Sequence, residues 1–138
     1  MRPLLLLSAA LCVTGLAIAP IANAQSAKPA LYTDAQTTAG AQVYASSCAA
    51  CHGTQLEGVA APALKGAAFG EMAAAQSLTV ATLLEVIVNT MPQSEPGSLK
   101  PEEYAAVTAY ILQQNGYPAG TAALAAGAAG TKDAKITP

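Results

Sequence analysis

The chain has 138 residues and a formal net charge of −2, and only 10% of its residues are charged. A basic surface for nucleic acid or for an anionic membrane is therefore not expected. Much of the 53% hydrophobic fraction is alanine, and the chain has one Phe and no Trp. A small domain with so few bulky apolar side chains fills its core poorly, so we expect a large apolar cofactor to complete it.

The first 24 residues have the pattern of a secretory signal peptide. Arg2 gives a positive start, residues 4–19 form an uncharged apolar run, and Ala22-Asn23-Ala24 offers the small residues that a signal peptidase recognises. Cleavage before Gln25 predicts a periplasmic protein. The alternative is an uncleaved membrane anchor, since the apolar run is nearly long enough to span a bilayer. We favour cleavage because Pro20 interrupts the run.

After the leader, the sequence divides into three parts. Residues 25–32 form a short polar lead, residues 33–118 carry the helical patterns, and residues 119–138 form an Ala/Gly-rich tail without a clear period. Within the central part, residues 53–70 are rich in glycine and are typical of a loop. No stretch has the alternation of a strand, so the predicted class is all-α.

Three main helices are expected in residues 33–118. The first covers residues 33–47 and the second residues 79–89, with Thr79 as its N-cap. The third begins at Pro101 and is stopped by Asn115-Gly116. Their apolar positions recur at helical spacing: Leu83, Val86, Ile87 and Thr90 in the second helix, and Tyr104, Val107 and Ile111 in the third.

The cysteines and the histidine beyond the leader fall in one pentapeptide. Cys48 and Cys51 are separated by two alanines, and His52, the only histidine, follows directly. C-x-x-C-H is the signature of covalent c-type haem attachment. In a helical turn Cys48 and Cys51 project from one side, so both thiols reach the vinyl groups along one porphyrin edge. His52 is then directed at the iron as its proximal ligand. The sequence predicts one covalently bound haem c.

Three other interpretations of this motif are weaker. A thioredoxin-type redox pair needs a βαβ context, and no strand pattern is present. A zinc site lacks a second pair of ligands in the mature chain. A structural disulfide between cysteines this close in sequence closes a short loop and adds little stability.

Met72 and Met91 are the two candidates for the other axial position of the iron. Met91 stands between the second helix and Pro92, in a loop able to fold over a flat cofactor, so we favour it. Met72 lies in an Ala-rich stretch, where a gap-filling core side chain is the simpler interpretation. Ligation by His52 and Met91 would raise the reduction potential and leave no open position, which suits electron transfer.

The chain resembles class I bacterial cytochromes c over roughly residues 33–118. That resemblance implies the cytochrome c fold, in which three main helices and their loops enclose one haem. It also implies that Gly40 and Tyr44 meet Val107 and Tyr110 where the first and last helices cross. The matching residues, in the family's order, are Gly40, Tyr44, Cys48-Ala-Ala-Cys51-His52-Gly53, Gly58, Pro62-Ala63-Leu64-Lys65-Gly66, Met91-Pro92 and the run Val107–Leu112.

The family pattern also implies a role for Pro62, whose backbone carbonyl would bind the second ring nitrogen of His52 and fix its tautomer. Two positions depart from the pattern. Many relatives have Gly before the ligand methionine, whereas Thr90 stands here, so any positive φ would fall on Asn89. Lys100 stands where Ser or Thr often caps the last helix, which should weaken that helix end.

We therefore expect a periplasmic one-electron carrier, not an enzyme, that docks transiently through a small interface. Residues 91–99, Tyr104 and residues 115–118 are similar to small cytochromes that accompany periplasmic quinoprotein dehydrogenases. The expected partners are thus a dehydrogenase donor and an oxidase or cytochrome acceptor, with no stable membrane insertion after cleavage. Two alternatives stay open: a haem subunit of a dehydrogenase complex, and a ligand-binding or catalytic c-type haem protein with an open sixth position.

Overall fold

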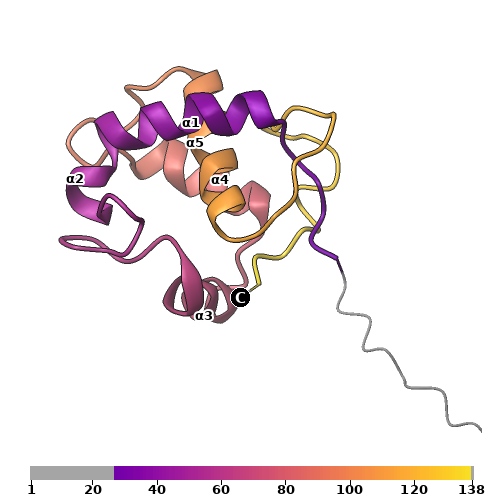
Figure 1. Ribbon diagram of the computed structural model, residues 1–138, viewed down its shortest axis with the longest axis horizontal. Helices are drawn as coiled ribbons and strands as arrows, with labels where there is room; N and C mark the ends of the chain where they lie inside the picture. The colour runs from indigo at the N-terminus through magenta and orange to yellow at the C-terminus, as the bar shows by residue number, and fades with distance from the viewer. Residues whose placement is uncertain (1–26, 138) are drawn as a thin grey trace, which may run out of the picture.

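The computed structural model describes residues 27–137, so the signal peptide expected in residues 1–24 lies outside the described part. The described residues form five helices and no extended strand, which confirms the all-α class. None of these helices is long and apolar enough to cross a membrane. The helices are α1 (Asp34–Ser47), α2 (Ala49–His52), α3 (Gly66–Ala75), α4 (Val80–Thr90) and α5 (Pro101–Gln114), and Figure 1 shows their arrangement.

Helices α1 and α5 cross in close contact and form the main helix pair of the fold. Gly40 permits this approach, because a Cβ at that position would overlap the backbone carbonyl of Ala106. The rings of Tyr44 and Tyr110 lie 5.4 Å apart across the crossing, as the family pattern implied. The atoms nearest to a Cβ at Gly40 belong to Ala106 and Tyr110, and Val107 on the same helix is buried in the core.

The predicted N-cap of α4 is confirmed, but its predicted buried face is partly wrong. The Thr82 N–H donates to the Thr79 hydroxyl at 3.2 Å, and the Thr79 N–H donates to the Thr82 hydroxyl at 2.7 Å. Val86 is 47% exposed, because the buried residues of the helix lie on its opposite face. Those buried residues follow positions i, i+3, i+4 and i+7 and are Val80, Leu83, Leu84 and Ile87.

Helix α3 is the element that the sequence pattern did not predict. It begins at Gly66, within the stretch of residues 53–70 that was expected to be a loop. Phe69 and Ala73, four residues apart, form its buried face. Alanine and glycine fill most of the other positions of α3, so Phe69 alone does not produce a recognisable helical periodicity of apolar residues. Met72 is half-buried and packs against the core from this helix.

The ends of α5 differ in how they are closed. The Lys100 side chain forms no cap, but the Glu103 carboxylate accepts the Lys100 N–H at 2.8 Å, which offsets the expected weakness. Asn115 ends the helix as predicted, and Gly116 follows with φ +76°. Between these ends the helix is buried on most sides, through residues 104–109, Ile111 and Leu112.

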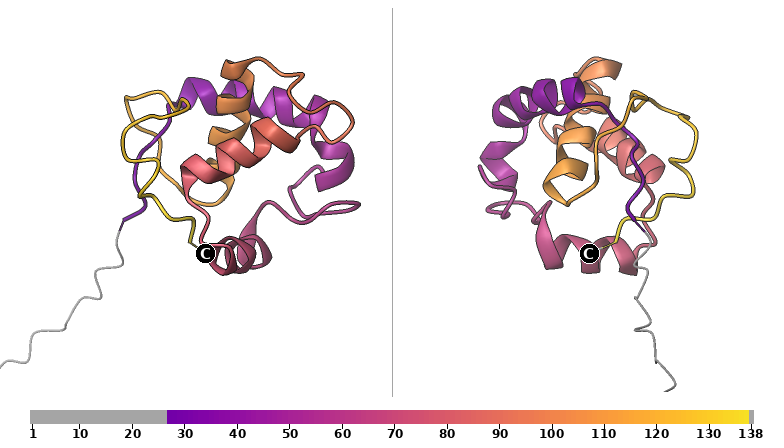
Figure 2. Two further views of the ribbon diagram at one scale, coloured as in Figure 1. Left: turned by 180° about the vertical axis from the view of Figure 1, so that it is seen from behind. Right: turned by 45° about the vertical axis from the view of Figure 1, so that its right-hand side comes forward.

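The C-terminal tail is an ordered part of the fold. Its carbonyls accept hydrogen bonds from the first turn of α4, at 2.9 Å from Val80 N to Ala134 O and 3.1 Å from Ala81 N to Thr131 O. These N–H groups have no partner inside their own helix. Leu124 and Ile136 are each only 2% exposed. The tail therefore supports the beginning of α4, and Figure 2 shows it (in yellow) running beside the N-terminal lead.

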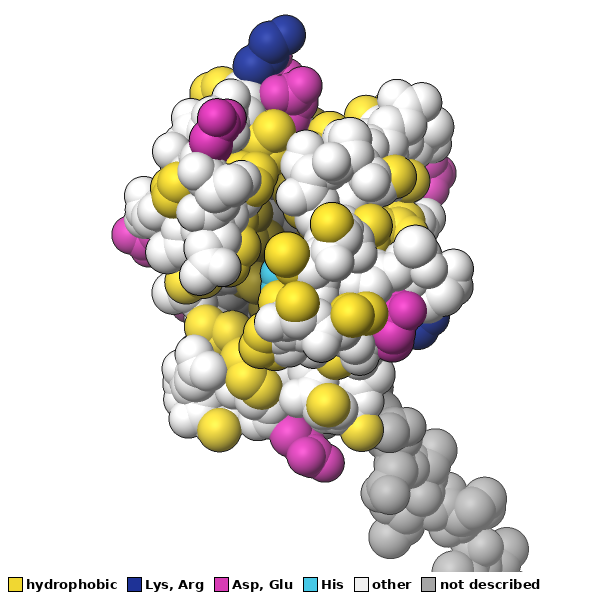
Figure 3. All heavy atoms as spheres, turned by 90° about the vertical axis from the view of Figure 1, so that its left-hand side faces the viewer, with side chains coloured by type: hydrophobic (Ala, Val, Ile, Leu, Met, Phe, Trp, Pro, Cys, Tyr) yellow, Lys and Arg dark blue, Asp and Glu magenta, His cyan; other side chains and the backbone are white. Residues whose placement is uncertain are grey.

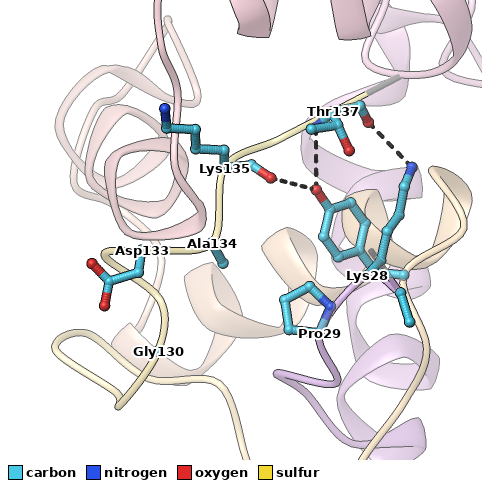
Figure 4. A pocket seen from close by; sticks show the side chains of 9 residues that line it. Lys28, Pro29, Gly130, Asp133, Ala134, Lys135 and Thr137 are labelled. Carbon is cyan, nitrogen blue, oxygen red and sulfur yellow. Dashed lines mark hydrogen bonds between the residues drawn. The ribbon is translucent and has the colours of Figure 1, made fainter. Parts of the chain in front are cut away.

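A lysine ties the lead and the tail to the end of α5. The Lys28 ammonium donates to the carbonyls of Asn115 at 2.9 Å and Thr137 at 3.1 Å. It also lies 5.0 Å from the ring centre of Tyr117, whose hydroxyl donates to the Lys135 carbonyl at 3.0 Å (Figure 4). A shallow pocket of about 340 Å³ lies at this junction.

If the tail supports α4, then Ile136→Ala should destabilise the holoprotein by ~2–4 kcal/mol, because a buried side chain is removed and its cavity remains. Chemical denaturation followed by far-ultraviolet circular dichroism measures this difference in unfolding free energy. Lys132→Ala, at an exposed position of the same tail, is the matched control and should leave the free energy nearly unchanged. Equal stability of the Ile136→Ala and Lys132→Ala proteins would contradict a supporting role.

Candidate haem-binding site

The pentapeptide that begins at Cys48 forms the single turn of α2 and its entry. The Cys48 N–H donates to the Tyr44 carbonyl at 2.9 Å and so ends α1, and the His52 N–H donates to the Cys48 carbonyl at 3.0 Å. Cys48 is half-buried, Cys51 is exposed, and both are free thiols. Desolvation by burial raises the pKa of Cys48 to about 11, so this thiol is protonated at neutral pH.

The imidazole of His52 is buried to 9% exposure, and one of its two nitrogens has a hydrogen-bond partner. Nδ1 lies 2.8 Å from the backbone carbonyl of Pro62. Since a carbonyl only accepts, Nδ1 carries a proton, and in the neutral imidazole Nε2 then presents a lone pair. Within residues 27–137 no hydrogen bond involves Nε2. Figure 3 shows the single histidine of the chain at the bottom of a cleft whose walls are mainly hydrophobic.

Two residues beside the pentapeptide hold its C-terminal end. The buried hydroxyl of Tyr44 donates to the Gly53 carbonyl at 2.6 Å. Burial, with a smaller effect of nearby ionisable groups, raises the pKa of Tyr44 to about 12, so the hydroxyl stays a donor. Gly53 has φ +83°, and a Cβ there would overlap the Glu57 carboxylate. Sequence reasoning treated Tyr44 as a packing residue and missed this hydrogen bond.

The loop that carries Pro62 is fixed on both sides. The N–H groups of residues 59–61 all point to the Cys51 carbonyl, at 3.0–3.2 Å. On the other side, the Asn115 amide donates to the Leu64 carbonyl at 2.9 Å and accepts from the Gly66 N–H at 3.1 Å. From the sequence we expected Asn115 only to stop the helix, because nothing local indicates that its side chain reaches a distant loop.

Met91 follows the last turn of α4 with extended backbone, φ −126° and ψ 151°. Its side chain is half-buried and packs against the core. The positive φ considered for Asn89 is absent, because α4 continues through Asn89 and Thr90 in helical geometry. In Figures 1 and 2 the loop after α4 lies at the same end of the molecule as α2. Met72 lies on α3, which Figure 1 places on the opposite side from α1.

These groups fit a covalently bound haem. Two free thiols directly precede a histidine whose Nε2 is available, and an apolar cleft opens above its imidazole. Among the described residues, no group of three or more His, Cys, Asp or Glu side chains is placed to hold a metal ion. The arrangement is that of a c-type cytochrome domain.

Comparison with known proteins gives the family. The family model described as cytochrome c oxidase, cbb3-type, subunit III matches residues 35–111, which is more than half of the chain. The chain belongs to this family of c-type cytochrome domains. No curated protein and no solved structure matches it significantly. Family membership supports a haem electron-transfer protein that carries covalently bound haem c.

Proposed function

We propose that this chain is a periplasmic one-electron carrier of the class I type, with a single haem c attached through Cys48 and Cys51 and ligated axially by His52 and Met91. The observation that carries the proposal is the His52 imidazole: its Nδ1 is held by the Pro62 carbonyl at 2.8 Å, while its Nε2 forms no hydrogen bond within residues 27–137. An imidazole fixed in this way is oriented for ligation.

Each of these residues has a separate task in the proposed carrier. The haem iron, when bound, supplies a one-electron couple. The two cysteines retain the cofactor outside the cell, where lost haem is not replaced. The Pro62 carbonyl keeps His52 in one tautomer. Met91 fills the remaining axial position and excludes external ligands, and its thioether favours the ferrous state.

The placement in the periplasm rests on the leader, which we propose is cleaved before Gln25. Family membership agrees with this placement, since c-type cytochrome domains are typically extracytoplasmic. The proposed organisation is therefore a leader (1–24), a lead (25–32), a cytochrome domain (33–118) and a C-terminal tail (119–138). The intact mass of the purified mature chain tests the cleavage site.

The proposal also concerns the electron donor and whether the chain acts alone or as a subunit. The similarity of residues 91–99 to small cytochromes of quinoprotein dehydrogenases favours a dehydrogenase as electron donor. The family description names an oxidase subunit, which favours a second candidate function, that of a permanent haem subunit in a larger complex. Purification from the native membrane and soluble fractions separates the two: a free carrier is recovered alone, and a subunit is recovered with its complex.

An anaerobic spectroelectrochemical titration tests the carrier function. We expect a single Nernstian transition of one electron per chain that is fully reversible, because both axial positions are filled in both oxidation states. Hysteresis between the oxidative and reductive directions would instead indicate that a ligand is exchanged during the cycle. More than one transition would contradict a single haem.

A further inference from the structure

The loop that follows Met91 has few contacts that fix it. Its residues 93–98 are exposed, and its internal hydrogen bonds are two backbone turns, from Glu95 N to Pro92 O at 2.9 Å and from Ser98 N to Glu95 O at 3.2 Å. Neither turn connects the loop to the rest of the molecule. The Met91 N–H is held by the Ile87 carbonyl of α4 at 2.9 Å, but the Met91 carbonyl and the loop after it need a partner from another element.

One side chain reaches both ends of this loop. Tyr104, in the first turns of α5, is 3% exposed, and its hydroxyl donates to the Met91 carbonyl at 2.8 Å. The same hydroxyl accepts the Leu99 N–H at 3.4 Å. In the part of the chain that the structure describes, no other side chain outside residues 91–99 forms a hydrogen bond with this segment.

We propose that Tyr104 is a positioning residue that holds Met91 in place by closing its loop against α5. The inference rests on the proposed ligation by Met91 and adds the element that makes this ligation stable. The phenol is held rigidly, because its ring lies in the core and its helix is buried on most sides. Displacement of the Met91 backbone away from α5 would break the hydrogen bond from Tyr104, so this bond would keep the methionine where its sulfur could ligate a bound haem iron.

The test uses carbon monoxide as a competitor for the position of Met91 in the reduced holoprotein. Apparent affinity for an external ligand is proportional to the fraction of protein from which the methionine has dissociated. Tyr104→Phe keeps the ring and removes the hydroxyl, so we expect it to raise the apparent affinity about five- to tenfold, the effect of one hydrogen bond. The near-infrared sulfur-to-iron band of the oxidised variant should also disappear at a lower temperature than in the wild type.

Thr108→Val is the matched control, since Thr108 is fully buried on the same helix and its hydroxyl donates to the Tyr104 carbonyl at 2.8 Å without reaching the loop. It should leave the carbon monoxide affinity unchanged. In a chain that already carries Met91→Ala, adding Tyr104→Phe should have no further effect, because the ligand that Tyr104 positions is gone.

Three results would overturn the inference. Equal effects of Tyr104→Phe and Thr108→Val would show a general loosening of α5. Unchanged affinity in Tyr104→Phe, together with a large increase in Met91→Ala, would reject the role of Tyr104 while leaving the ligation intact. Unchanged affinity in Met91→Ala would reject the ligation itself, and the inference with it.

Discussion

Met91→Ala is expected to convert the protein from one that excludes external ligands into one that binds carbon monoxide readily when reduced. Under the proposed ligation, the position that Met91 would fill becomes open, because alanine has no donor atom. The reduction potential should fall, because thioether ligation favours ferrous iron. Optical titration with carbon monoxide and spectroelectrochemistry measure the two effects, and the near-infrared sulfur-to-iron band should be absent from the oxidised variant.

Met72→Ala is the matched control for this experiment. Met72 is also half-buried and also packs against the core, but from helix α3. Its loss should reduce the unfolding free energy by ~1–3 kcal/mol and leave carbon monoxide binding and the potential as in the wild type. If Met72→Ala instead opens the iron and Met91→Ala does not, the axial assignment is reversed.

Cys51→Ala is expected to reduce severely the yield of mature holoprotein. The variant keeps one thiol of the motif, at Cys48, which is half-buried and could form only one of the two thioether bonds. Without haem the apolar cleft above His52 has nothing to fill it, so the apo-chain should have weak helical circular dichroism and broad amide resonances. Absorbance at the haem band per mole of purified chain and circular dichroism measure these effects.

Acid–acetone extraction provides the control for covalent attachment in the wild type. The haem colour should remain with the polypeptide, whereas a haem held only by axial ligands is extracted. Clean extraction from the wild type, or a well-dispersed amide spectrum from the apo-chain, would contradict the roles given to the two cysteines and to the cofactor.

Local signals in the sequence were sufficient for the helices whose ends and faces are strongly marked. Thr79 and Asn115 were recognised as helix boundaries because capping depends on residues that are adjacent in the chain. Helix α3 was missed because its buried face contains one bulky residue, Phe69, among alanines and glycines. The tail was taken as featureless for the same reason, although Ile136 is buried as deeply as core residues of the helices.

In the candidate site, too, the features with a local sequence signal were predicted and the non-local ones were missed. The three residues of the C-x-x-C-H motif were found because haem attachment requires them at a fixed local spacing. The groups that hold the surrounding loops were not found, because each acts across a long sequence separation. Asn115 reaches Leu64, and Tyr104 reaches back to Met91. Such pairings depend on how α5 is placed against both loops, and no local pattern in the sequence encodes that placement.

The most direct test of the central claim, that the chain carries electrons through an iron with both axial positions filled by its own residues, is exposure of the reduced wild-type protein to carbon monoxide at neutral pH. If His52 and Met91 are the iron ligands, as proposed, they would leave no vacant position, so the visible spectrum should not change. Rapid formation of a carbon monoxide adduct would contradict the electron-carrier account and would establish the chain as a haem protein with an open sixth position.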